Sequence, residues 1–230
     1  MFRAVLIFGL TLVAVRAADI EGHVVIKRKL TRPTVTASAR FYERGVSVDP
    51  GSGQDEDPLA LERNPVVINL EGQLPSPPAT ATLEQKKQRF VPDTLVVSLG
   101  STVSFPNFDP ILYNVFSLSK EKSFDLGNYP KDHTRRVTFP KPGIIFVHCH
   151  LHPNMAAAIV VCPNQWNTKG DGAGRFIISS VPSGSYTIVA WHKAAGFFRQ
   201  PIRVSQDHAT NVQFVIPLDE NGRANAVARR

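Results

Sequence analysis

Short apolar runs, separated by turn-forming residues, recur along most of this chain. Runs of four to eight residues rich in Val, Ile, Phe and Thr are typical of β-strands, and eighteen Pro and fifteen Gly residues punctuate them. Only 83–90 keeps a weak helical period. The pattern predicts an all-β fold. The expected strands are 20–27, 34–42, 64–70, 89–98, 102–107, 113–117, 124–127, 136–139, 143–149, 156–162, 175–179, 186–191, 201–204 and 210–216, with an exposed loop at 46–64.

The most distinctive chemistry of the chain lies between two of these strands. The apolar run 143–147 leads into HCHLHPNM at 148–155, and a second apolar run, MAAAIVV, follows at 155–161. Two extended runs joined by a short turn predict a β-hairpin. The reactive side chains would then lie at its tip.

Three side chains of this loop have the chemistry of metal ligands. Cys149, His152 and Met155 follow one another at intervals of three. A thiolate, an imidazole and a weak thioether are the ligand types of a blue-copper centre. Because side chains alternate along a strand, His148 and His150 are expected to point away from the side that Cys149 faces.

The two cysteines allow a second interpretation, a disulfide, which an exported chain would favour. In the predicted hairpin, however, Cys149 lies at the tip and Cys162 near the base. Seven strand residues separate those levels by roughly 20 Å, whereas a disulfide requires Cα atoms within about 7 Å. We therefore do not expect a disulfide between Cys149 and Cys162.

The N-terminal segment has the pattern of a secretory signal peptide. Arg3 precedes the apolar run 4–15, and small residues follow it, so we place cleavage after Ala17. An uncleaved membrane anchor is the alternative, although the run is shorter than the roughly 20 residues of a membrane span. The mature protein is expected to be periplasmic or secreted, with no membrane span after cleavage.

The charge of the chain argues against a nucleic-acid partner. Lys and Arg number 26 against 19 Asp and Glu, for a net charge of +7. Removing 1–17 takes away Arg3 and Arg16 and leaves +5. No dense basic run is present, as nucleic-acid binding would need, so the charge fits solubility or docking of an acidic partner.

The block 85–161 resembles the cupredoxin family, in particular plastocyanin-like domains of exported bacterial proteins of the methylamine-utilisation-like type. The matching pieces are RFVPDTLVVSLGSTVSFPNFDP, YNVFSLS, FDLGNYP, VTFPKPG and FVHCHLHPNM, in this order. The resemblance implies a Greek-key β-sandwich with one copper ion in a type 1-like site.

Within this resemblance, Cys149 would be the thiolate ligand, His152 an equatorial imidazole and Met155 the axial thioether. The family's remaining imidazole belongs to a His-Asn-Val-Phe-Ser segment, which here begins with Tyr113. A neutral phenol, with an ordinary pKa of about 10, is a poor copper ligand. The HCH triplet also resembles multicopper oxidases, but outside 148–152 the chain has no His-x-His pair, and their longer Cys-to-His spacing is absent.

The C-terminal GRFIISSVPSGSYTIVAWHKAAG resembles the carboxypeptidase regulatory-like, transthyretin-like β-sandwich, which is also carbohydrate-binding-like. EGHVVIKRKL and NPVVINLEG, at the other end of the chain, fit the first strands of that domain. We therefore expect a cupredoxin domain inserted into this smaller sandwich, with tandem domains as the alternative. The predicted divisions are a signal peptide at 1–17, a cupredoxin domain at 77–164, the second sandwich at 18–76 with 166–218, and a flexible tail at 219–230.

These features predict an exported copper-binding protein that transfers single electrons or handles copper. A redox partner would dock on apolar residues beside the ligands, namely Pro153 and 156–158. The alternative is a structural module with a degenerate metal site, whose second sandwich contacts a glycan or a protein. We do not expect an enzyme, because the sequence has no convincing Ser-His-Asp set, phosphate loop, carboxylate pair or complete hydrolytic zinc motif.

Overall fold

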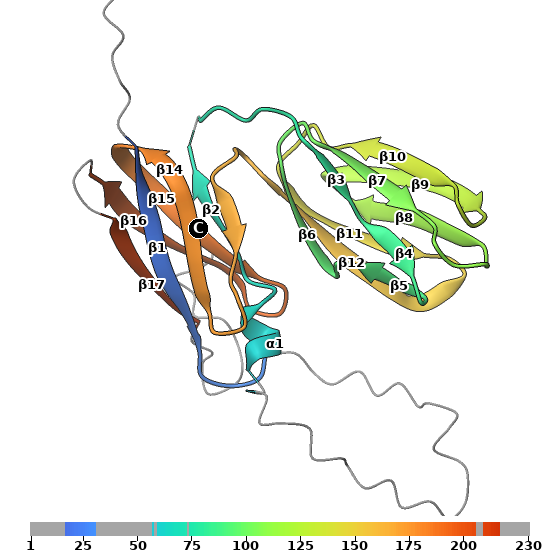
Figure 1. Ribbon diagram of the computed structural model, residues 1–230, viewed down its shortest axis with the longest axis horizontal. Coiled ribbons are helices and arrows are strands. Elements are labelled where there is room, and N and C mark those ends of the chain that lie inside the picture. Colours follow the sequence, from blue (N-terminus) through green and yellow to red (C-terminus); the bar gives the residue numbers. More distant parts are fainter. Residues whose placement is uncertain (1–16, 31–56, 58, 73, 206–208, 217–230) are drawn as a thin grey trace, which may run out of the picture.

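The computed structural model describes residues 17–30, 57, 59–72, 74–205 and 209–216. Its strands form two sandwiches that lie side by side (Figure 1). We call the one that contains β1, β2 and β13–β17 the outer sandwich, and the one that contains β3–β12 the inner sandwich. The predictions for the signal peptide, the strand at 34–42 and the tail concern residues that lie outside the described ranges, apart from Ala17, which begins β1.

The outer sandwich is built from strands of both ends of the chain. One sheet has the order β14-β1-β17 and the other β13-β2-β15-β16. The parallel partner of β1 is β17, and its antiparallel partner is β14. The strands are β1 (Ala17–Ile26), β2 (Val67–Glu71), β13 (Asn167–Lys169), β14 (Arg175–Pro182), β15 (Gly184–His192), β16 (Gly196–Val204) and β17 (Thr210–Ile216).

The core of the outer sandwich explains one glycine of β1. Ile20, Val24 and Ile26 face inward at alternate positions, where they share one buried cluster with residues of β14 and β17. At Gly22 a Cβ atom would lie 2.2 Å from the ring of Phe176 and 2.4 Å from the carbonyl oxygen of Val212. The two neighbouring strands therefore leave room only for glycine at this position.

The inner sandwich holds the hairpin that carries the predicted ligands. Its sheets have the orders β10-β7-β3 and β6-β12-β11-β8-β9, and β4 pairs with β5 beside them. The strands are β3 (Thr80–Thr82), β4 (Glu84–Lys86), β5 (Arg89–Val91), β6 (Thr94–Ser98), β7 (Thr102–Pro106), β8 (Tyr113–Ser119), β9 (Lys122–Tyr129), β10 (Thr134–Thr138), β11 (Gly143–Cys149) and β12 (His152–Cys162).

One weak sequence pattern has no counterpart in the structure, and one local prediction was wrong in part. The segment 83–90, with its weak helical period, forms the β4–β5 hairpin, whose turn residues Lys87 and Gln88 both have positive φ angles. Of the loop predicted at 46–64, the structure describes residues 57 and 59–64, and within them lies the short helix α1 (Ala60–Arg63). The weak period at 83–90 is too short to separate a helix from a hairpin.

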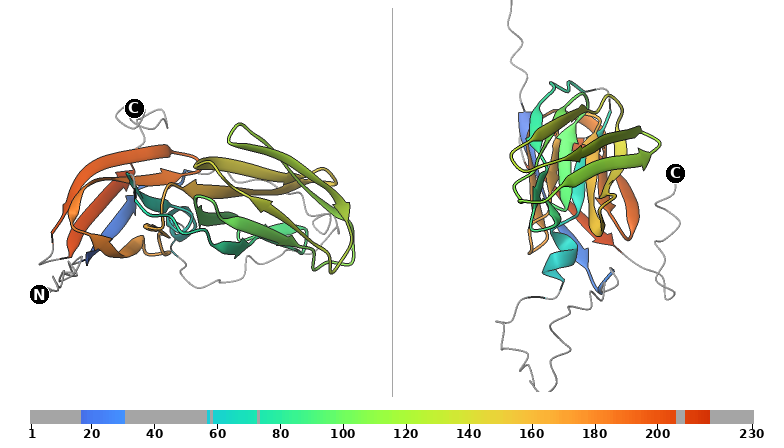
Figure 2. Two further views of the ribbon diagram at one scale, coloured as in Figure 1. Left: turned by 90° about the horizontal axis from the view of Figure 1, so that it is seen from above. Right: turned by 90° about the vertical axis from the view of Figure 1, so that its right-hand side faces the viewer.

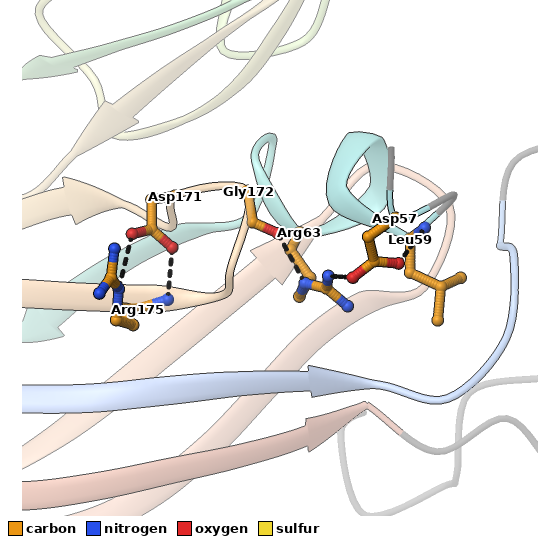
Figure 3. A network of polar contacts seen from close by, with 6 residues as sticks. All are labelled: Asp57, Leu59, Arg63, Asp171, Gly172 and Arg175. Carbon is orange, nitrogen blue, oxygen red and sulfur yellow. Dashed lines mark hydrogen bonds and ion pairs between the residues drawn. The ribbon is translucent and has the colours of Figure 1, made fainter. Parts of the chain in front are cut away.

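Helix α1 is fastened to the turn before β14, as Figure 3 shows. Arg63 donates from Nε to the carbonyl oxygen of Gly172 at 2.9 Å and forms an ion pair with Asp57. Asp171 closes that turn by accepting from the backbone and side chain of Arg175, at 2.8 and 3.0 Å. The helix thus covers one end of the outer sandwich.

A buried acid–base pair secures the same helix from the other side. Glu62 and His192 are 1% and 0% exposed, and Nε2 of His192 lies 3.4 Å from Oε2 of Glu62. Burial lowers the pKa of His192, against the opposing effect of the Glu62 carboxylate. His192 is the last residue of β15.

Strand β12 joins the two sandwiches because both of its faces are buried. One face, which includes Ile159, belongs to the inner core. The other face packs on the outer sandwich, where it contacts Val67 and Trp191. Figure 2 shows that the two neighbouring sandwiches form a curved arrangement. The residues of β12 on this second face are Ala158, Val160 and Cys162.

Within the described ranges, no helix has both the length and the apolar character that a bilayer span requires.

Candidate metal centre

The β11–β12 hairpin brings two of the predicted ligands face to face. Cys149 and His152 are directly paired across a turn of two residues. The next pair is His148 with Ala156, so that three extra residues, 153–155, bulge from β12. A bulge of this kind re-aims side chains near a strand end. The predicted hairpin is confirmed, and the bulge is what the sequence pattern did not reveal.

The thiol and the imidazole are close enough to share one ion. Sγ of Cys149 lies 3.6 Å from Nδ1 of His152, within hydrogen-bonding range for sulfur. Bonds of about 2.3 Å to sulfur and about 2.0 Å to nitrogen, as zinc forms, would separate two ligands of a tetrahedral ion by about 3.5 Å. The observed separation therefore fits a metal as well as it fits a hydrogen bond.

Met155 lies in the same buried cluster as Cys149 and Tyr113. Its side chain is 1% exposed, although both residues before it are exposed. The bulge thus turns a single residue of this segment inward. The donors that the hairpin offers on its inner side are a thiol, an imidazole and a thioether, which together suit a soft ion such as Cu(I).

The histidines that flank Cys149 point outward, as the alternation predicted. His150 stacks on Phe116 with ring centroids 3.7 Å apart and planes 2° apart, and His148 packs on the same ring at 5.8 Å. Nε2 of His150 lies 3.4 Å from Oδ2 of Asp125. Both histidines therefore belong to the outer face of the sheet, away from the thiol of Cys149.

Asn114 connects the hairpin tip to the neighbouring strands. Its Nδ2 donates to Oδ1 of Asp125 at 2.6 Å, and its Oδ1 accepts from the backbone N–H of His150 at 3.4 Å. The backbone N–H of Gly127, followed by Asn114, lowers the pKa of Asp125. Asn114 is 2% exposed. Apart from the position of Asn114 after Tyr113, no sequence pattern indicates this role.

Tyr113 lies beside the pair, as predicted, but its hydroxyl is occupied. The side chain is 0% exposed, and its ring meets the ring of His152 edge-on at 5.2 Å. Its hydroxyl donates to Oδ2 of Asp109 at 2.5 Å and accepts from the backbone N–H of Gln88 at 2.9 Å. The pKa of Tyr113 is raised to about 12, by burial and then by Asp109. The phenol is therefore neutral at physiological pH.

Asp109 is itself held in place by the loop between β7 and β8. Its backbone N–H donates to Oδ1 of Asn107 at 2.9 Å. Asn107 is 0% exposed and donates to the carbonyl oxygens of Ile111 and Tyr129, at 2.8 and 3.2 Å. Sequence reasoning missed Asp109 and Asn107, although the FPNFDP segment that contains them carried part of the family resemblance.

No group of three or more His, Cys, Asp or Glu side chains among the described residues is arranged to hold a metal ion. A metal at the hairpin tip would consequently depend on the thioether of Met155 in addition to Cys149 and His152. This donor set is unsuited to hard cations, which require oxygen ligands.

The docking patch that the sequence predicted beside the ligands is partly buried. Ala157 and Ala158 are 1% and 0% exposed, so that part of the prediction was wrong. Both faces of β12 are buried, which the pattern of a single strand cannot reveal. Large exposed apolar side chains come instead from the β7–β8 loop and the hairpin turn. They are Phe108, Ile111, Leu112 and Leu151.

The prediction that Cys149 and Cys162 are not bonded to each other is confirmed, since both are free and buried. Cys162 lies between the sandwiches, where its neighbours are apolar. Burial raises the pKa of the Cys162 thiol to about 12.

No protein-family model matches this chain, and no curated protein matches it either. Similar solved structures include the copper-containing nitrite reductase NirK from Thermus scotoductus SA-01, at 25% identity and a TM-score of 0.33, over 40% of this chain and 23% of that one. A mutant of amicyanin with Cu(I) matches 41% of this chain over 97% of its own length, at 21% identity and a TM-score of 0.34.

A purple cupredoxin from Nitrosopumilus maritimus covers 35% of this chain and 98% of its own, at 19% identity and a TM-score of 0.32. The match to the nitrite reductase spans less than a quarter of that protein's length. The similarities involve well under half of the chain. At these TM-scores they carry no inference about chemistry, which rests on the side chains of the hairpin.

Proposed function

We propose that this protein binds one copper ion at the tip of the β11–β12 hairpin, through Cys149, His152 and Met155. The observation that supports the proposal most directly is the 3.6 Å separation of Sγ of Cys149 and Nδ1 of His152. The burial of Met155 beside them adds the third soft donor.

The choice of copper follows from the donor types. Thiolate and thioether sulfur favour Cu(I), and imidazole suits both oxidation states of copper. Zinc also accepts thiolate and imidazole, but its structural sites hold four Cys or His ligands, and the hairpin supplies two. When bound, copper would supply one-electron chemistry, as electron transfer needs. In copper handling, the ion itself would be passed on.

Either use needs a partner protein, and the apolar rim formed by Phe108, Ile111, Leu112 and Leu151 is the surface that we assign to it. These side chains are between 37% and 50% exposed. Exposed apolar patches of this kind mark interaction sites. Because the N-terminal sequence has the pattern of a signal peptide, both proteins would meet in the periplasm or outside the cell. The proposal assigns no catalytic step to the chain.

The test is a titration of the purified protein with Cu(I) under anaerobic conditions, in competition with bicinchoninate. We expect one copper ion per chain, with sulfur and nitrogen scatterers in the X-ray absorption spectrum. A chain that takes up no Cu(I), or holds it with oxygen donors alone, would refute the proposal.

A second candidate function is ligand binding by the outer sandwich, which we identify with the predicted regulatory-like domain. A groove of about 350 Å³ lies where the two sandwiches diverge. Phe197 is 36% exposed there, and Nε of Arg199 donates to Oε1 of Glu71 at 2.9 Å. Asn69 adds an amide to the same wall. An aromatic ring beside paired polar groups suits a neutral polyhydroxyl ligand such as a glycan.

This second candidate has an independent readout. Trp191 lines the groove, so its fluorescence should change when a neutral hexose oligosaccharide binds. Arg199→Ala should abolish that change while copper uptake stays the same. An unchanged emission spectrum at millimolar maltohexaose and cellohexaose would count against the glycan.

A further inference from the structure

Tyr113 lies next to the proposed copper site, where it takes the place of a fourth ligand. Tyr113 is 0% exposed and belongs to the buried cluster that contains Cys149 and Met155. Its ring packs edge-on against His152 at 5.2 Å. The ring therefore fills space next to the imidazole without offering a nitrogen donor.

The hydroxyl of Tyr113 cannot readily turn toward the thiol. Its proton is given to Asp109 at 2.5 Å, and its oxygen accepts from the backbone of Gln88 at 2.9 Å. The same backbone N–H of Gln88 also lies 3.1 Å from Oδ2 of Asp109. The Tyr113 hydroxyl, the Asp109 carboxylate and the Gln88 backbone N–H are thus all hydrogen-bonded to one another. The phenol oxygen has both a donor and an acceptor partner.

A deprotonated phenol is no better placed to act as a ligand. Its oxygen would face the carboxylate of Asp109 at hydrogen-bonding distance, and two anions so close repel each other. Asp109 has little freedom to withdraw, because Asn107 fixes its backbone and is itself bonded to two carbonyl oxygens. The loop thus holds the carboxylate against Tyr113.

The other described histidines do not replace the missing imidazole. His148 and His150 pack on Phe116 at the outer face of the sheet. His133 is exposed, with Nδ1 3.0 Å from the carbonyl oxygen of Lys131. The remaining ones, His23 and His192, belong to strand β1 and strand β15 of the outer sandwich.

Resting on the proposed function, we propose that Tyr113, fixed by Asp109, limits the site to three donors and thereby makes it selective for Cu(I). Cu(II) favours tetragonal sites rich in nitrogen and oxygen donors, whereas Cu(I) is satisfied by few and soft ligands. Loss of one imidazole weakens Cu(II) binding far more than Cu(I) binding. The site would then hold and release Cu(I), and it belongs to copper handling more than to electron transfer.

Copper titrations of the wild-type protein test the selectivity of the site for Cu(I) over Cu(II). Under anaerobic conditions it should bind one equivalent of Cu(I) and should show no intense visible band and no bound signal in electron paramagnetic resonance when Cu(II) is added. A one-to-one Cu(II) complex with an intense thiolate charge-transfer band would overturn the inference and leave the proposed copper function standing. Failure to bind Cu(I) would instead overturn the proposed function.

Two variants test the role of Tyr113 itself. Tyr113→His restores an imidazole, so Cu(II) affinity should rise at least a hundredfold and a visible band should appear, while Cu(I) affinity changes less than tenfold. Tyr113→Phe is the matched control, because it keeps the ring and adds no donor. Its Cu(II) affinity should stay within threefold of wild type.

Equal gains in Cu(II) binding for Tyr113→His and Tyr113→Phe would contradict the inference, because the hydroxyl and not the missing nitrogen would then set the selectivity. Cu(I) affinity within tenfold of wild type shows that each variant has kept the folded site. Should Tyr113→His fail to fold, the wild-type titrations still decide between the outcomes.

Discussion

Cys149 and Cys162 lie at opposite ends of one hairpin, and both are almost completely buried, at 3% and 1% exposed. Their surroundings differ. Cys149 has an imidazole nitrogen at 3.6 Å and Asn114 bound to the next residue along the chain. Cys162 is surrounded by Ala158, Val160 and Trp191 at the junction of the sandwiches.

Burial alone therefore does not identify a metal ligand. A buried thiol among apolar side chains behaves as a small hydrophobic residue, and the raised pKa of Cys162 keeps it protonated. A buried thiol beside an imidazole has a partner that can share either a proton or a metal ion with it. The two cysteines thus provide a comparison within one strand pair, and substitutions can test it.

The largest effect is expected from Cys149→Ser. A hydroxyl is a hard, weak donor for Cu(I), so loss of the thiolate should raise the Kd for Cu(I) at least a thousandfold, or about 4 kcal/mol. Competition with bicinchoninate measures this directly. Cys162→Ser is the matched control on the same hairpin and should leave the Kd within threefold.

Equal losses of copper affinity in the two serine variants would contradict the comparison. They would mean that the copper lies at the junction of the sandwiches, or that both variants lose affinity through misfolding. Far-ultraviolet circular dichroism of both variants separates these two explanations.

The sequence predicted the position of Cys149 in its hairpin well. The alternation of apolar residues placed the hairpin, oriented His148 and His150 outward, and kept Cys149 apart from Cys162. What it could not supply was the environment of Tyr113, because Asp109 reaches it from the loop just before β8 and Gln88 from the β4–β5 turn. Hydrogen bonds across such loops leave no periodic signal in a sequence.

The same limit explains the error in the docking patch. The run at 156–158 reads as a small-residue surface beside the ligands, yet Ala158 faces Val67 and Trp191 of the other sandwich. A strand that is buried on both faces can have the same composition as a strand with one exposed apolar face. Only the arrangement of the two sandwiches distinguishes them.

A smaller loss of copper affinity is expected from Asn114→Ala. This change removes the bond to the backbone of His150 and leaves Asp125 with one partner fewer. Substitutions of groups that orient metal ligands typically cost ten- to a hundredfold in affinity. We expect a rise in the Kd for Cu(I) of about tenfold. A variant with wild-type affinity would show that the hairpin tip holds its shape without Asn114.

The last effect concerns fold stability at Cys162 and appears only at high pH. Its pKa is raised from 9.0 to about 12 by burial, so the folded state keeps a proton that the unfolded state loses above pH 9. The free energy of unfolding is therefore unaffected by the ionisation of this thiol below pH 9. As the pH rises from 9 toward 12, that free energy falls by up to about 1.4 kcal/mol per pH unit. Cys162→Ser has no such group, whereas Cys149 and the buried tyrosines are common to both proteins. The free energy of unfolding of wild type, minus that of Cys162→Ser, should therefore fall between pH 9 and 10.5 in urea titrations. A difference that stays constant over this range would mean that water reaches Cys162 and that the two thiols are less different than their neighbours imply.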